Sequence, residues 1–373
     1  MLVIKEVKTK KEQRDFINFP LKLYHGCSYF VPPLYSDELK IFKKNYIYNE
    51  VATSIFFNVY LDGQMVGRIS GIIQHSANLK WQQKRVRFTR FDCIDNQEVA
   101  NRLFSAVEAW AKDQGIEEIV GPLGYSDLER EGLLISGFDQ LATFEEQYNY
   151  DYYQRLIENY GFQKEVDWIE HKLMRPEVID ERMLKLSNMM MERYHLHLLR
   201  GKSTRWILKH YADQVFSIID ETYVNLYGTV PMTDGMKKML LDNFKLIVNS
   251  KYIAIVLDEN DRIVCFGIVF PSIAKALQKS KGKLTIPALF RLLKDLRHPK
   301  IIDMALVGVL PEYEHKGIAS LMIAHNLQMF DMYHIEHFET NLCLETNHKI
   351  LNMWKHFDAV AHKVRRSYVK KID

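Results

Sequence analysis

Hydrophobic and polar residues alternate with two different periods along this chain, which predicts a mixture of strands and amphipathic helices. Asp62-Gly63 separates two runs rich in β-branched and aromatic residues, a pattern typical of a β-hairpin. Val99, Leu103 and Val107 recur at helical spacing, and Gly115 suits the end of that helix. The first half is therefore predicted to contain a hairpin, a strand, a helix, a strand, a helix and a strand. In that order, these elements fall at residues 55–61 with 65–74, 86–91, 96–114, 116–123, 151–160 and 164–174.

The same order of elements recurs in the second half. The matching elements fall at residues 252–257 with 263–270, 301–310, 317–333, 338–344, 348–357 and 364–369. Residue identity between the halves is low, so we interpret the pattern as a duplication of fold. Pro176 suits a helix start, which predicts two domains, residues 1–175 and residues 176–373. The predicted fold class is α/β, with a mixed, mostly antiparallel sheet flanked by helices in each domain.

Charge and cysteine content narrow the class of protein. The chain has 50 Lys and Arg against 47 Asp and Glu, a net charge of +3 over 373 residues. This near balance disfavours a dedicated nucleic-acid-binding protein or a polybasic membrane protein. The four cysteines form no C-x-x-C pair, which favours a reducing compartment. No apolar run approaches the ~20 residues of a membrane helix, so we expect a cytoplasmic protein with neither a nucleic-acid nor a membrane partner.

Two basic segments have structural interpretations. Residues 271–299 have no counterpart in the first half, and they carry an apolar stripe of Leu289, Leu292, Leu293 and Leu296. We favour a helical insertion packed on the core over a lid beside a site. The basic residues from Lys363 to Lys371 are interpreted as an edge strand, where charges discourage further pairing.

The informative chemistry lies in residues 307–322. An apolar strand ends at Leu310, a short polar loop follows, and a helix starts near Gly317. The first N–H groups of a helix lack internal partners and carry partial positive charge, so they bind anions. Gly317 allows close approach of a phosphate because it has no Cβ. With one glycine in the loop, the segment is neither a P-loop nor a dinucleotide fingerprint.

This segment resembles motif A of the GNAT N-acetyltransferase superfamily, V-x-P-x-[FY] followed by [QR]-x-x-G-x-[GA]. The matching residues are Val309, Pro311, Tyr313, Gly317 and Ala319. Glu314 departs from the family, which usually has Gln or Arg there, and its carboxylate would repel a pyrophosphate. The corresponding segment of the first half, residues 91–99, has no glycine before its helix. The chain is therefore similar to tandem GNAT proteins of bacteria, with a degenerate first domain that lacks a CoA loop.

The resemblance implies acetyl-CoA, or another acyl-CoA, as cofactor. The backbone from Val309 to Leu310 would bond the pantetheine arm, and the N–H groups of residues 315–320 would hold the pyrophosphate. The strands near Val309 and Leu344 would splay to admit the thioester. The implied cofactor-binding residues are Val309, Leu310, Glu314, His315, Lys316, Gly317, Ile318, Ala319, Ser320 and Asn347.

Acyl transfer to an amine requires a base that removes a proton from an ammonium group. Asp303 and Glu345 are the candidates, and Asp303 is notable because charged residues inside predicted strands are unusual. A solvated strand end or an Arg partner is the structural alternative for each. Trp354 stands where the family often has a Tyr that protonates the leaving thiolate. His334 and His337 lack the H-E-x-x-H spacing, so no metal site is expected.

We therefore expect an acyl-CoA-dependent N-acyltransferase in which a small-molecule or peptide amine attacks the thioester directly in a ternary complex. The alternative is a CoA-binding or interaction protein that kept the fold and lost turnover, which Glu314 and Trp354 favour. Aminoacyl-tRNA-dependent transfer also occurs on paired halves of this fold, but the near-neutral charge disfavours it. We expect a monomer or a homodimer.

Overall fold

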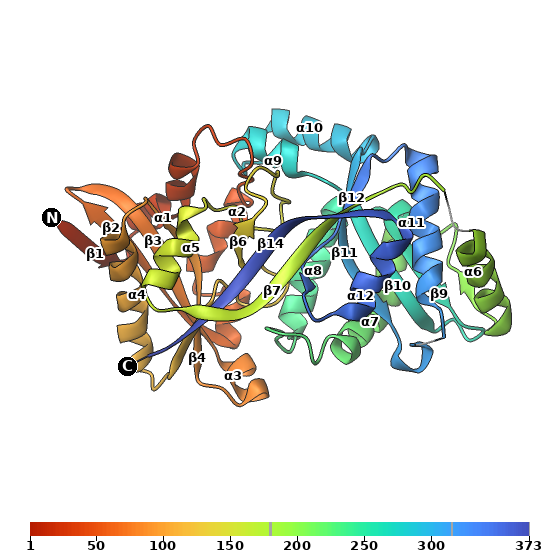
Figure 1. Ribbon diagram of the computed structural model, residues 1–373, viewed down its shortest axis with the longest axis horizontal. Helices are drawn as coiled ribbons and strands as arrows, with labels where there is room; N and C mark the ends of the chain where they lie inside the picture. The colour runs from red at the N-terminus through yellow and green to blue at the C-terminus, as the bar shows by residue number, and fades with distance from the viewer. Residues whose placement is uncertain (179–180, 315, 373) are drawn as a thin grey trace.

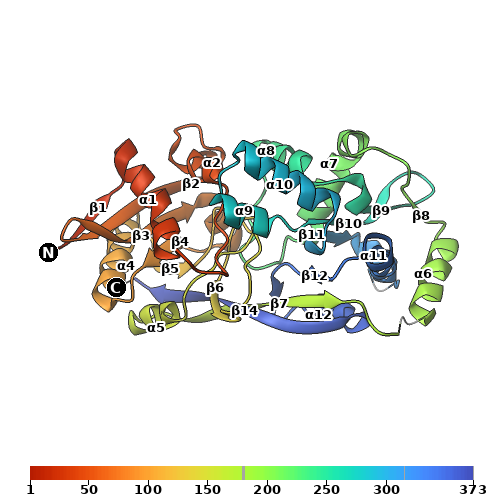
Figure 2. The ribbon, with the colours of Figure 1, turned by 90° about the horizontal axis from the view of Figure 1, so that it is seen from above.

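The computed structural model describes residues 1–178, 181–314 and 316–372. Its strands form one sheet that runs the length of the molecule (Figures 1 and 2). The strands of the first half are β1 (Leu2–Glu6), β2 (Ala52–Leu61), β3 (Gln64–Gln74), β4 (Arg85–Cys93), β5 (Glu118–Gly121), β6 (Leu133–Ser136) and β7 (Gln163–Met174). The strands of the second half are β8 (His197–Leu198), β9 (Ile253–Leu257), β10 (Ile263–Pro271), β11 (Ile301–Val309), β12 (His337–Glu339), β13 (Cys343–Leu344) and β14 (Asp358–Lys371).

Helices cover both faces of this sheet. Those of the first half are α1 (Lys10–Leu23), α2 (Tyr35–Glu38), α3 (His75–Trp81), α4 (Gln97–Lys112) and α5 (Tyr152–Asn159). Those of the second half are α6 (Glu181–Arg193), α7 (Thr204–Thr222), α8 (Asp234–Ile247), α9 (Ala274–Ser280), α10 (Ile286–Arg297), α11 (Ala319–Tyr333) and α12 (His348–Met353). Among the helices of the described ranges, none has the length and hydrophobicity that crossing a lipid bilayer demands.

The predicted duplication is confirmed in the order of the elements. The hairpins are β2–β3 and β9–β10, and each is followed by a strand, a helix and a second strand that pairs in parallel with the first. In the first hairpin, Asp62 and Gly63 have φ of 49° and 84°, as a two-residue type I′ turn requires. The mixed, mostly antiparallel sheet with flanking helices is therefore as predicted.

The two halves exchange their last strands. The order along the sheet is β1-β2-β3-β4-β5-β14-β7-β12-β11-β10-β9-β8. β14, from the end of the chain, pairs with β5 of the first half, and β7 pairs with β12 of the second half. Figure 1 shows the yellow-green β7 and the blue β14 side by side across the middle of the molecule. The predicted boundary at residue 175 follows directly after β7, so neither sequence half contains all the strands of one half of the sheet.

The interpretation of the C-terminal basic residues as an edge strand is wrong. β14 lies in the middle of the sheet, and Lys363 and Arg365 are 1% and 0% exposed. The Lys363 Nζ lies 2.7 Å from Glu170 Oε2, and the Arg365 Nε lies 2.6 Å from Glu170 Oε1. Burial acts to raise the pKa of Glu170, but the charges of Lys363 and Arg365 hold it below its ordinary value. Alternating charges in this strand therefore mark buried ion pairs between β7 and β14.

We expect that the Glu170→Leu substitution lowers the free energy of unfolding by about 3–5 kcal/mol, because it removes the nearest carboxylate of two buried cations and leaves only the more distant Glu339 and Glu146, at 3.6 and 3.8 Å. Urea unfolding at neutral pH measures this change. The matched control is Lys84→Met, since the Lys84–Glu117 pair lies in solvent with side chains 63% and 67% exposed. Its expected cost is below about 1 kcal/mol. Equal costs for the two variants would contradict a structural role for the buried pairs.

Candidate functional site

The candidate site lies where β11 parts from its neighbouring strand. β11 pairs in parallel with β12 from Ile301 to Asp303, and Asp303 lies opposite Glu339. The chain then leaves β11, and β13 pairs with β7 instead. From Met304 onward, β11 has no neighbouring strand on that side among the described residues. The predicted divergence of these two strands is confirmed.

The open edge of β11 presents the backbone groups of alternate residues. The Tyr223 hydroxyl, from the end of α7, donates to the Val307 carbonyl at 2.9 Å. On the opposite edge, the Leu310 N–H donates to the Val264 carbonyl at 3.0 Å. Because successive strand residues direct their backbone groups to opposite edges, Val309 faces the open edge as Val307 does. Of the two residues predicted to meet a pantetheine arm, Val309 is the one directed toward the opening.

The helix that follows β11 begins with N–H groups that have no acceptor among the described residues. Gly317 has a φ of 74°, and α11 starts two residues later. The Ser320 N–H donates to the Gly317 carbonyl at 3.0 Å. For the N–H groups of Gly317, Ile318 and Ala319, no acceptor is recorded in the described part of the chain. Such a helix start attracts an anion, as the sequence predicts.

A cavity of about 380 Å³ opens onto this helix start. Its lining residues are Arg182, Met183, Leu186, Gly317, Ala319, Ser320, Ile323, Lys349, Asn352, Met353 and His356. The Lys349 Nζ lies 2.6 Å from Glu314 Oε2. The unfavourable carboxylate that distinguishes Glu314 from the family pattern is therefore offset by a neighbouring cation, and Arg182 adds a second positive charge to the cavity wall.

Several other predicted cofactor-binding residues have side chains engaged in local contacts. The Lys316 ammonium lies over the rings of Tyr194 and Tyr313, at 5.2 and 4.8 Å from the ring centroids. The Asn347 side chain caps α12 by accepting the Ile350 N–H at 3.3 Å. His315 lies outside the described residues. Contacts of this segment with a ligand therefore fall mainly to its backbone.

Asp303 is the most unusual titratable group near the opening. Its side chain is 2% exposed, and among the described residues neither carboxyl oxygen has a hydrogen-bond partner. Burial raises the pKa of Asp303 to about 7, and the negative charge of Glu339 adds to the rise. The nearby Ser272 hydroxyl opposes the rise without completing a hydrogen bond. Within the described ranges, Asp303 thus has neither of the structural alternatives considered for it, exposure to solvent or an Arg partner.

The neighbouring carboxyl has the opposite electrostatic environment. Burial acts to raise the pKa of Glu339, but His337, His362 and Lys363 hold it well below its ordinary value. The His362 Nε2 lies 2.8 Å and the His337 Nε2 3.1 Å from the two carboxylate oxygens. Two carboxyls on paired strands thus differ in protonation near neutral pH, the pattern that separates an acid from a base.

Glu345, the other candidate base, is engaged elsewhere. Its carboxylate accepts the Asp167 N–H at 3.2 Å and lies 2.9 Å from the Lys164 Nζ. The sequence did not reveal His362 and Lys363 as neighbours of Glu339. The sequence does contain a signal, the basic residues from Lys363 to Lys371 in a predicted strand, but these residues were interpreted as a solvent-facing edge. The structure records no group of three or more His, Cys, Asp or Glu side chains suited to a metal in its described ranges.

The equivalent helix start in the first half is already satisfied. The Asn96 side chain accepts the N–H groups of Glu98 and Val99, at 2.9 and 3.2 Å. Those donors are the ones that hold an anion at a bare helix start. In this half the Asn96 side chain thus occupies two of the donors that an anion would need.

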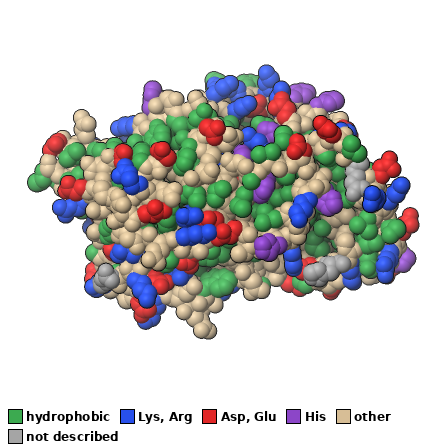
Figure 3. Space-filling model, in the orientation of Figure 1, with side chains coloured by type: hydrophobic (Ala, Val, Ile, Leu, Met, Phe, Trp, Pro, Cys, Tyr) green, Lys and Arg blue, Asp and Glu red, His purple; other side chains and the backbone are tan. Residues whose placement is uncertain are grey.

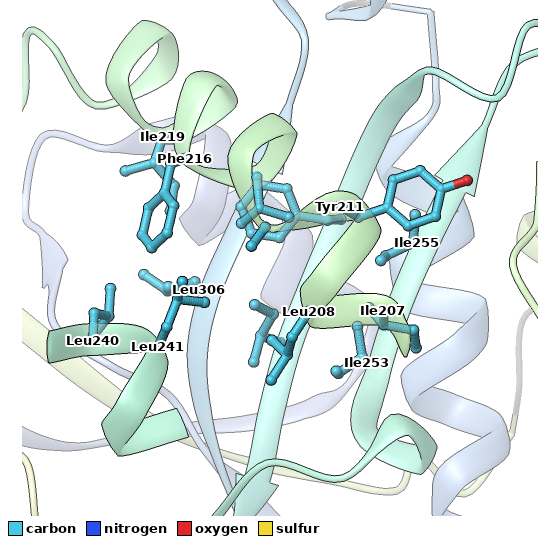
Figure 4. A pocket seen from close by; sticks show the side chains of 14 residues that line it. Ile207, Leu208, Tyr211, Phe216, Ile219, Leu240, Leu241, Ile253, Ile255 and Leu306 are labelled. Atoms are coloured by element: carbon cyan, nitrogen blue, oxygen red, sulfur yellow. The ribbon is translucent and has the colours of Figure 1, made fainter. Parts of the chain in front are cut away.

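A second cavity lies between α7, α8 and the sheet (Figure 4). Figure 4 shows aliphatic and aromatic side chains that point toward one another, among them Phe216, Leu240 and Leu306. The space measures about 30 Å³, roughly the share of one water molecule in the liquid. We interpret it as a packing void in the core of the second half.

Two curated relatives match nearly the whole chain, and a solved structure identifies its fold. No protein-family model matches the chain. Protein YghO of Escherichia coli K12 is 26% identical over 99% of this chain and 95% of its own length. The bacterial ceramide synthase of Caulobacter vibrioides is 23% identical over 98% of this chain and 96% of its own length. The solved structure of a tandem GNAT protein from the clavulanic acid biosynthesis pathway superposes with a TM-score of 0.58, at 9% identity, over 100% of this chain and 99% of that one. The chain has the tandem GNAT fold.

The pKa of Asp303 predicts a pH-dependent effect on stability. A carboxyl whose pKa rises on folding favours the folded state at low pH and loses that contribution as pH increases toward about 7. The Asp303→Asn variant has no carboxyl at this position, so it does not lose stability in this way as the pH rises. Its stability relative to wild type should improve between pH 4 and pH 8 by up to about 4 kcal/mol. Urea unfolding at several pH values measures the difference, and parallel profiles would contradict the raised pKa.

Proposed function

We propose that this protein is an acyl-CoA-dependent N-acyltransferase, which acetylates or otherwise acylates an amine. The observation that carries the proposal is the arrangement along one strand. The N–H groups of Gly317, Ile318 and Ala319, which have no acceptor among the described residues, follow the carboxyl end of β11, and the buried carboxyl of Asp303 lies where β11 leaves β12. The open edge of β11 runs from Asp303 toward the start of α11. A ceramide is an amide of a long-chain amino alcohol, so the name of the Caulobacter relative also supports amide formation.

The residues at the helix start fit acetyl-CoA. The N–H groups of Gly317, Ile318 and Ala319 can bind a diphosphate, and Arg182 provides a counter-charge in the adjoining cavity, where Lys349 offsets the carboxylate of Glu314. Val309 offers its backbone groups to an amide-containing arm along the open edge of β11. When bound, the cofactor supplies the acyl group as a thioester, which the amine converts to an amide with release of the CoA thiol.

Asp303 is proposed as the general base. An amine is protonated at neutral pH and becomes nucleophilic only after it loses that proton. A carboxylate with a pKa of about 7 can accept the proton near neutral pH. Glu339 remains ionised beside Asp303, and its charge favours uptake of a proton by Asp303. Asp303 would thus hold the proton taken from the acceptor.

The alternative is a protein that binds CoA without turnover. Trp354 favours it, because this side chain is 6% exposed, is buried in the core of the second half and cannot serve as an acid for the leaving thiol. The two functions share a cofactor site and differ in the use of Asp303. Measurements of cofactor binding and of acyl transfer therefore distinguish them.

Calorimetry should detect acetyl-CoA binding to the wild-type protein, weakened at least about tenfold by Gly317→Val. A branched side chain would crowd Met190 and Leu186 beside the helix start and would disfavour the left-handed backbone that directs these N–H groups. Gly115→Val is the matched control, because Gly115 has a φ of 72° and a Cβ there meets nothing within 4 Å. Absence of binding at high micromolar acetyl-CoA, or equal loss in both variants, would contradict the cofactor site.

The Asp303→Asn variant should retain acetyl-CoA binding and lose roughly 10²–10⁴-fold in kcat. CoA release across a panel of amines, monitored with a thiol reagent, measures this loss. The wild-type rate should rise with pH through about 7, and the variant should lack that limb. Binding without CoA release in any wild-type reaction would favour the non-catalytic alternative.

A further inference from the structure

The α9–α10 excursion between β10 and β11 has an unusual outer face. α10 packs on α9 through one side, where Leu292 and Leu296 join a buried cluster at the junction of the two halves. Its opposite side is also apolar. Ile286 is 75% exposed and Phe290 is 70% exposed, and Leu284, Leu289 and Leu293 are between 43% and 51% exposed. The stripe of leucines predicted to face the core is thus split between the inner and outer sides of the helix.

The outer residues form a continuous stripe. Ile286, Leu289, Phe290 and Leu293 follow the i, i+3, i+4, i+7 spacing of one helix face. An ordinary surface helix directs charged and polar residues outward. Residues 284–293 hold five of the large apolar side chains that the described chain exposes to solvent. Such a gathering marks an interaction surface, unlike isolated exposed apolar residues.

The same excursion is strongly basic. Residues 274–297 contain seven Lys and Arg and one Asp, a local charge of +6 compared with +3 for the entire chain. The cations are Lys275, Lys279, Lys281, Lys283, Arg291, Lys294 and Arg297. Within the described ranges, none of them forms a salt bridge with a carboxylate. Figure 3 shows Lys and Arg side chains together with hydrophobic ones along the upper edge of the molecule, where Figure 1 places α10.

We propose that the outer face of α9–α10 binds the surface of a bilayer that contains anionic phospholipid. An apolar stripe flanked by cations is the composition of helices that lie in the membrane interface. The stripe would enter the boundary between headgroups and acyl chains, while Lys294 and Arg297 meet lipid phosphates. α10 forms the upper edge of the molecule in Figure 1 and lies on the side seen from above in Figure 2, so a flat surface can reach it.

Two other occupants fit the observations less well. A second copy of the chain would bring two surfaces of charge +6 together, which like-charge repulsion opposes. A nucleic acid would engage the cations but leave the exposed Ile286 and Phe290 without apolar partners. The expectation of no membrane partner rested on the net charge of the whole chain and on the lack of an apolar run long enough to span a bilayer, and neither reveals this local excess. The proposal goes beyond the proposed enzymatic function and stands without it.

Sedimentation with lipid vesicles tests the proposal on the full chain. We expect binding to phosphatidylcholine vesicles that contain about one-third phosphatidylglycerol, and little binding to phosphatidylcholine alone. Binding should weaken at about 0.5 M salt, because screening reduces the attraction of the cations. The Phe290→Asp variant should bind about tenfold or more weakly, since it removes an inserted aromatic side chain and adds a negative charge.

The control variant is Leu79→Asp, because Leu79 on α3 is 82% exposed and lies outside the excursion. It should bind vesicles as the wild type does. Circular dichroism should report unchanged folding for both variants, since both positions are in solvent, and both should bind acetyl-CoA as the wild type does. Failure of the wild type to bind anionic vesicles, or unaltered binding by Phe290→Asp, would overturn the proposal. A dimer in sedimentation velocity that Phe290→Asp dissociates would also overturn it, in favour of self-association.

Discussion

The buried ion pairs between β7 and β14 are the constraint on which the rest of the structure depends. Glu170 meets both Lys363 and Arg365 where water has little access, so a shift of register between these strands would leave charges unpaired. β7 and β14 join the two halves into one sheet, because β14 pairs with β5 of the first half and β7 pairs with β12 of the second half. β7 also receives β13, which would otherwise be free to continue beside β11. The opening along β11 therefore follows from the same exchange that joins the halves.

β11 connects three features of the second half in space. Its first residue follows the basic excursion, and the Ser272 N–H closes the base of that excursion on the Ile301 carbonyl at 2.9 Å. Its third residue is Asp303. Its last residue precedes the helix start that carries Gly317. At about 3.3 Å per residue, roughly 27 Å separates the two ends of the strand. An acceptor that approaches from the side of the excursion and a cofactor held at the helix start would thus meet along one strand.

The sequence predicted those features whose signals are local. The hairpins, the strand–loop–helix at residues 307–322 and the unusual charge at Asp303 all depend on neighbours within a few residues. The place of β14 was not predictable in this way, because its partners Glu170 and Glu339 are distant in the chain and its charges suit an edge strand as well as a buried one. The outer stripe of α10 was missed for a related reason. Periodicity identifies an apolar helix face, but the packing of α9 decides which face is covered.

A crystal structure of the protein with acetyl-CoA tests the central claim most directly, namely that β11 and the start of α11 together hold an acyl thioester beside Asp303. The account predicts a diphosphate bound by the N–H groups of Gly317, Ile318 and Ala319, a pantetheine arm along the edge that carries Val307 and Val309, and the thioester near Asp303. A diphosphate bound elsewhere, or a helix start closed by a side chain of the protein itself, would contradict it.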